Sequence, residues 1–94
     1  MKLDNFSYKI SARADGQVYH VYAENDGAGH EFIAHHAGNM WVVVSAEISD
    51  MYEAGDYVPA ENLRTKLLSL FMTHYAAIKR ATKYTTEAID VALL

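Results

Sequence analysis

Three histidines in the N-terminal half are the side chains best suited to metal chemistry. His20, His35 and His36 fall in stretches that read as neighbouring strands, so a sheet would place His20 beside either member of the adjacent pair. His35 and His36 would point to opposite faces of one strand and would not share an ion. A site could combine His20, one histidine of that pair and one carboxylate, either Glu24 or Glu31. This ligand set would suit zinc or iron. The spacing matches no metal signature, so no metal is expected, and these three histidines are secondary candidates.

Catalytic patterns are weaker still. No serine lies in a Gly-x-Ser-x-Gly elbow, and the lack of cysteine removes thiol nucleophiles, disulfides and thiolate metal sites. Gly27-Ala28-Gly29 begins like a dinucleotide-binding fingerprint, but Phe32 stands where the third glycine belongs and no strand–helix–strand unit follows. We therefore expect neither enzymatic activity nor a cofactor.

Acidic residues recur at a regular spacing in the middle of the chain. Glu47, Asp50 and Glu53 are three residues apart, so a helix would carry them along one side in steps of about 4.5 Å, and Asp56 and Glu61 would extend the cluster. Phosphates along a nucleic-acid strand repeat at a similar interval, about 3.4 Å. The row could therefore occupy a basic groove on another protein. A solvated helix face is the alternative interpretation.

Aromatic residues are numerous, with seven tyrosines, three phenylalanines and one tryptophan. Protein surfaces that stack the bases of single-stranded nucleic acid also carry Lys and Arg. The second, third and fourth predicted strands contain neither Lys nor Arg. An aromatic and acidic surface therefore fits a protein partner better. Most of these rings are expected to fill the core. Tyr22 is the best interface candidate, because it shares its strand face with Val18 and His20.

Composition and charge limit the class of protein. The chain has 94 residues, of which 51% are hydrophobic, with one proline and a formal net charge of −4. Residues 14–63 contain no Lys or Arg but hold nine of the twelve acids and four of the five histidines. This distribution argues against a basic nucleic-acid-binding module, and the length predicts one domain over residues 1–94.

The first half has the period of two that is typical of strands. Apolar and polar residues alternate from Phe6 to Ala12, and similar runs cover residues 17–24, 30–37 and 40–44. Asp15-Gly16, residues 25–29 and Gly38-Asn39 supply turns between the runs. These signals predict an antiparallel meander of three or four strands over about residues 5–44.

The second half has a helical period. Ser45 is suited to cap a short acidic helix over about 46–54 that Gly55 would end, although a strand continuing through Ile48 is an alternative. A long C-terminal helix is predicted over about 59–82, with Pro59 at its first position. Ile89, Val91 and Leu93 then alternate with small or polar residues, so the tail over 86–94 favours a final strand over a second helix.

The apolar seam of the long helix is wider than one sheet requires. Leu68, Met72 and Tyr75 widen the seam beyond the arc of about 100° that packing on a sheet needs. They are therefore candidates for self-association, with a homodimer as the simplest outcome. His74 lies on the seam and is expected to be packed in the core. The basic residues Lys79, Arg80 and Lys83 complement the helix dipole at its end.

The sequence thus predicts an α+β protein with the meander packed on the long C-terminal helix. Its expected role is that of a non-enzymatic protein-binding module, for example a phage or mobile-element inhibitor of a host nucleic-acid-processing complex. A small metal- or ligand-binding protein or enzyme that uses the histidine-bearing strands, and an oligomeric structural component, are the alternatives. No direct nucleic-acid or membrane binding is expected. Residues 1–5 are polar where a signal peptide needs an apolar run, so the expected location is cytoplasmic. The predicted partner-binding residues are Glu47, Asp50, Glu53, Asp56, Tyr22 and His20.

Overall fold

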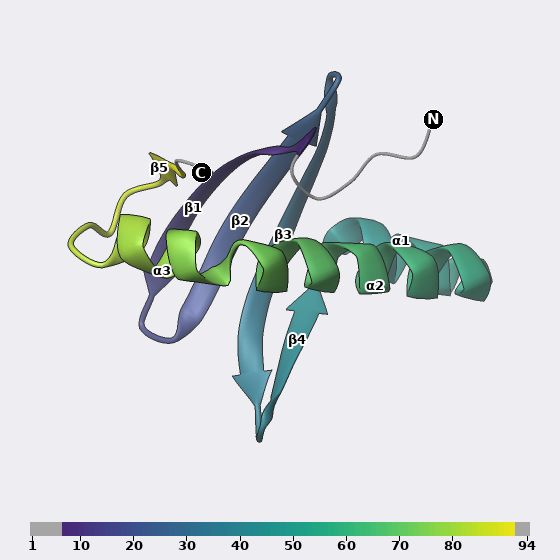
Figure 1. Ribbon diagram of the computed structural model, residues 1–94. Coiled ribbons are helices and arrows are strands. Elements are labelled where there is room, and N and C mark those ends of the chain that lie inside the picture. Colours follow the sequence, from purple (N-terminus) through teal and green to yellow (C-terminus); the bar gives the residue numbers. More distant parts are fainter. Residues whose placement is uncertain (1–6, 92–94) are drawn as a thin grey trace.

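Four strands follow one another through the N-terminal half and pair as neighbours. In the computed structural model, which describes residues 7–91, they are β1 (Lys9–Asp15), β2 (Val18–Asn25), β3 (Ala28–Ala37) and β4 (Met40–Val44). With a short fifth strand, β5 (Ile89–Asp90), they form one antiparallel sheet in the order β4-β3-β2-β1-β5 (Figure 1). The predicted α+β class and the antiparallel pairing are confirmed. The part of the predicted first strand before residue 7 lies outside the described residues.

Two-residue turns fix the register of the four long strands. The connections are residues 16–17, 26–27 and 38–39. Asp26 and Gly27 both have positive φ angles, 51° and 80°, which the tight hairpin turns that match the twist of the flanking strands require. The predicted second turn was too long, because Ala28 and Gly29 already belong to β3.

The short acidic helix is present as α1 (Ala46–Glu53), and the strand alternative is wrong. The Ile48 backbone N–H donates to the Ser45 hydroxyl oxygen at 3.0 Å, which satisfies one of the free N–H groups of the first turn. Ile48 is buried, and Gly55 follows the helix with a φ of 82°. The chain therefore turns from β4 into α1 at one capping residue.

The long helix was predicted as one element over 59–82, and this is wrong. The structure has α2 (Tyr57–Thr73) and α3 (Tyr75–Thr82), separated at His74, whose backbone N–H is shared between the carbonyls of Leu70 and Phe71. The Thr73 hydroxyl donates to the Ser69 carbonyl at 2.8 Å, a contact that bends helices. Asp56 is the residue before α2, so Pro59 is the third helical residue rather than the first.

The core lies between the sheet and these helices. Helix α2 contacts β3 and β4, and α3 contacts β1 and β5. Figure 1 shows α2 and α3 crossing the strands of the sheet. The rings of Tyr19, Trp41, Phe71 and Tyr75 all contact one another, with centroids 4.9–6.0 Å apart. Most aromatic side chains of the sheet therefore serve the core, as predicted. Buried apolar strand residues on this side are Ile10, Ala12, Tyr19, Val21, Ala23, Phe32, Ala34 and Val43.

The tail returns to the sheet as the two-residue strand β5 (Ile89–Asp90), which pairs antiparallel with β1. The Val91 N–H donates to the Ile10 carbonyl at 2.8 Å. The predicted final strand is therefore present but short, and the remainder of the predicted alternation, residues 92–94, lies outside the described residues. Within residues 7–91, no helix combines the length and apolar character that crossing a membrane requires.

Candidate functional site

One face of the sheet has no helix across it among residues 7–91. We call this the open face and define it by the alternate residues of the strands that point away from α2 and α3. Ser11 and Arg13 belong to it from β1, and they lie opposite Tyr22 and His20 of β2. Because side chains alternate along a strand, the burial of one set in the core leaves the other set on this face. The other residues of the open face that matter here are Glu31 and Ile33 of β3 and Val44 of β4.

The open face is hollowed. A cavity of about 600 Å³ spans the strands from Val44 of β4 to Ser11 of β1, and it is open to solvent. Glu47, in the first turn of α1, contributes to one side, and Ala88, just before β5, contributes to the lining near β1. This volume lies in the range of sites that bind small molecules or side chains of a partner, about 300–1,000 Å³.

Three large apolar side chains line this hollow although solvent reaches them. The exposed fractions of Tyr22, Ile33 and Val44 are 45%, 37% and 45%. Ile33 lies directly opposite Val44, and Tyr22 occupies the position diagonal to Ile33. Direct neighbours in a sheet are close enough for side chains of this size to touch, so Ile33 and Val44 form a pair. The Tyr22 ring lines the same hollow but is directed toward Gly29, on the side away from Ile33. We call these three side chains the apolar floor.

Gly29 leaves the space in which the Tyr22 ring lies. A Cβ atom at Gly29 would overlap the hydroxyl group and ring of Tyr22. Its φ is not positive, so the backbone conformation does not favour glycine here, and Gly29 contributes the space that the Tyr22 ring occupies. The Tyr22 ring therefore lies down over the β3 backbone, and one of its faces can meet a ligand.

Charged side chains stand around the apolar floor. Arg13 lies opposite His20, and Glu31 lies opposite Tyr22. Within residues 7–91, neither Arg13 nor Glu31 has an oppositely charged group within 4 Å. Both charges therefore remain for a ligand to meet, and with Glu47 the lining has two acids and one base.

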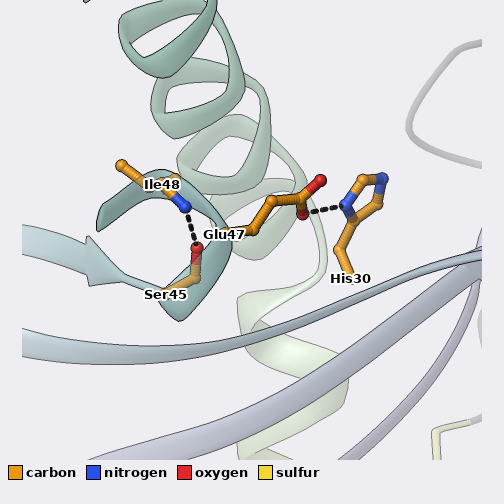
Figure 2. Close-up of polar contacts among 4 residues, drawn as sticks. All are labelled: His30, Ser45, Glu47 and Ile48. Carbon is orange, nitrogen blue, oxygen red and sulfur yellow. Dashed lines mark hydrogen bonds and ion pairs between the residues drawn. The ribbon is translucent and has the colours of Figure 1, made fainter. Parts of the chain in front are cut away.

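The start of α1 is tied to β3 by a hydrogen bond between two side chains. Glu47 Oε1 lies 2.9 Å from His30 Nδ1, beside the bond from Ile48 to Ser45 (Figure 2). His30 belongs to the side of β3 that faces the helices, and its side chain is 17% exposed. A carboxylate in the first turn also complements the positive end of the helix dipole. Glu47 is thus both a lining residue of the hollow and an anchor for α1.

The predicted acidic residues separate into two groups. Glu47 lines the hollow together with Tyr22 and His20, so the structure brings these three together. Asp50 and Glu53 are exposed further along α1, and Asp56 is exposed after it. We call Glu47, Asp50 and Glu53 the acidic row. It begins at the hollow and continues away from the sheet along α1.

Glu61 belongs to a separate contact between α1 and α2. It accepts hydrogen bonds from the Tyr52 hydroxyl and, at 2.6 Å, from the Arg64 guanidinium. These two donors lower the pKa of Glu61 below its ordinary value of 4.5, and the bond to Glu61 raises the pKa of Tyr52 above 10.0. Glu61 is therefore held in this contact, although its side chain is exposed, and it does not extend the acidic row.

This contact predicts how stability depends on pH. Because the folded-state pKa of Glu61 lies below its unfolded value, its ionised form stabilises the fold above pH 4.5, and the contribution is lost as pH falls through the lower folded-state pKa. In urea unfolding, the stability of Glu61→Gln should therefore fall less than that of the wild type as the pH is lowered from 7 through the acidic range below 4.5. Asp50→Asn is the control, and an equal flattening of its pH profile would contradict the assignment.

The histidines proposed as secondary metal ligands are divided by the sheet. His20 and His35 belong to the open face, whereas the His36 ring packs on Trp41 with centroids 3.9 Å apart. Among residues 7–91, no group of three His, Asp or Glu side chains could hold a metal ion. His74, as predicted, is buried, with a 5% exposed fraction.

The residues predicted for self-association have different environments. Tyr75 belongs to the aromatic core, because the break at His74 divides the helix just before it. Leu68 is half-buried against the core, and Met72 is 46% exposed. The apolar seam of the helix is therefore less available for contact with a second copy than the sequence indicated.

Searches with this chain found no matching family model, no matching curated protein and no matching solved structure.

Three residues of the site escaped the reasoning from sequence. Arg13, Ile33 and Val44 line the hollow but were not singled out. Alternation along each strand places all three on the same sheet face as His20 and Tyr22. The sequence did not give the register between the strands, which decides which side chains become neighbours on that face.

Proposed function

We propose that this protein binds another protein through the open face and the acidic row. The observation that carries the proposal is the solvent-exposed apolar floor of Tyr22, Ile33 and Val44 within a hollow of the uncovered sheet face. Large apolar side chains that stay exposed within one hollow and have polar residues around them are typical of sites that bind proteins. Tyrosine is moreover enriched among the residues that dominate binding energy at interfaces.

Charge indicates the chemistry of the partner. Glu31 and Glu47 outnumber Arg13 among the charged residues that line the hollow, and Asp50 and Glu53 continue the acidity along α1. A partner that places apolar side chains on the floor and Lys or Arg beside these carboxylates would match both features. Complementary charge of this kind speeds association and fixes orientation. We therefore propose a basic, partly apolar protein surface as the occupant, with a nucleic-acid-processing protein as one instance.

The test is selection of ligands from a displayed library of random peptides. Peptides selected on the wild-type protein should combine apolar residues with Lys or Arg, and their binding should fall roughly 10-fold to 100-fold with Ile33→Glu, a loss of about 1.4–2.8 kcal/mol. Met72→Glu, which places the same charge at an exposed helical site, should leave binding unchanged. Peptides that bind Ile33→Glu as well as the wild type would overturn the use of the open face.

The contribution of the acidic row is tested separately. The double variant Asp50→Lys with Glu53→Lys should bind the selected basic peptides more weakly. Its melting temperature should stay nearly unchanged, because both side chains are exposed. Glu47 is left intact because its reversal would also break the contact with His30. Unchanged affinity at low salt would remove the acidic row from the proposed surface.

A further inference from the structure

The two edges of the sheet are not alike. β5, at one edge, is two residues long and ends in Asp90. β4, at the other edge, has five residues, Met40–Val44, all paired with β3, and no second neighbouring strand among residues 7–91. An antiparallel strand with one neighbour directs alternate backbone N–H and C=O groups outward, where they can pair with another strand.

β4 also lacks the features that protect edge strands. Natural edges are blunted by Lys or other charges, by proline or by a bulge. The sequence Met-Trp-Val-Val-Val contains no charged residue and no proline, and its pairing with β3 is continuous from Met40 to Val44. The exposed fraction of Met40 is 69%. This edge therefore has the composition of a pairing site.

We propose that β4 pairs antiparallel with β4 of a second copy of this chain, about a two-fold axis at Val42. This register pairs all five residues, and it places Trp41 opposite Val43 and Met40 opposite Val44. Met40 and Val44 are the two most exposed β4 side chains, so each copy covers the exposed residues of the other. The inference does not depend on the proposed protein partner.

Charge favours a second copy over a charged strand. Because β4 carries no charge, two copies meet there without like-charge repulsion, and a Lys- or Glu-bearing strand would find no opposite charge on it. Antiparallel pairing also brings the turn at residues 37–39 of one copy toward the start of α1 of the other. That turn is Ala-Gly-Asn, small and uncharged, so it adds no acid next to the acidic row.

The pairing defines the character of the dimer. Two five-residue strands bury less than the roughly 1,200–2,000 Å² of stable complexes, so the association should be weak and should depend on concentration. Both open faces would belong to one continuous sheet, so the dimer would present two hollows on one surface.

Sedimentation tests the edge. Wild-type protein should pass from monomer to dimer between about 10 µM and about 1 mM, and Met40→Lys should raise the dissociation constant roughly tenfold or more. Met72→Lys is the matched control and should dissociate like the wild type. A wild-type monomer at about 1 mM, or dissociation by Met72→Lys instead of Met40→Lys, would overturn the proposal.

A single introduced cysteine tests the register, because the chain has none of its own. At the two-fold axis only residue 42 meets its own counterpart, so Val42→Cys should form an intermolecular disulfide on mild oxidation. Met40→Cys is more exposed but should cross-link at least about fivefold more slowly, because Cβ atoms of paired residues lie only about 4.5–5.5 Å apart and its partner is Val44. Equal rates for the two variants would indicate random collision and reject this register.

Discussion

Phe71→Ala should destabilise this protein more than any other change considered, by about 3–5 kcal/mol. Phe71 has no exposed surface and contacts the rings of Tyr19, Trp41 and Tyr75. The truncation removes apolar contacts and leaves a cavity between α2 and the sheet. A chain of this size has a total stability of about 5–14 kcal/mol, so a large part of it would be lost.

Urea denaturation followed by Trp41 fluorescence measures this loss, because the Trp41 and Phe71 ring centroids lie 4.9 Å apart. Met72→Ala, at the neighbouring and exposed position, should cost less than about 1 kcal/mol. If the two substitutions had similar effects, the placement of the aromatic cluster in the core would be wrong.

Ile78→Ala should have the second largest effect, about 2–5 kcal/mol. Ile78 is fully buried on α3, the helix that contacts β1 and β5. Its loss should loosen the docking of α3 and with it the short strand that follows. We therefore expect faster hydrogen exchange at the Val91 amide, which donates to the Ile10 carbonyl.

Arg80→Ala provides the control on the same helix, because Arg80 is exposed in the last turn of α3. It should change stability by less than about 1 kcal/mol and leave exchange at Val91 unchanged. If hydrogen exchange at Val91 stays at the wild-type rate in Ile78→Ala, the pairing of β5 does not depend on the docking of α3.

Local signals predicted the elements well where one residue decides the backbone conformation. The hairpin turn after Asp15 follows from Gly16, whose φ is 63°, and the start of α1 follows from the hydroxyl of Ser45. The break at His74 could not be predicted in this way. Apolar residues recur at helical spacing on both sides of it, and only the packed structure shows that the helix divides there.

The candidate site was predicted in part for a similar reason. Tyr22 and His20 share a strand face, which alternation alone indicates, and both line the hollow. Glu47 joins them only because α1 turns back beside His30 of β3, a contact over seventeen positions of sequence. The spacing of residues along the chain cannot indicate this contact, because the contact depends on how α1 lies beside β3.

The sequence by itself determined the α+β class, the strand alternation and the acidic character of α1. Each depends on residues that are close along the chain, through the two-residue period of strands, the helical period and the preference of Ser for helix starts. The tertiary structure decided which sheet face is open, that Tyr75 belongs to the core, and that β4 is a free edge among the described residues. These features depend on how distant elements pack, because burial and strand order arise only when separate parts of the chain compete for the same apolar surface.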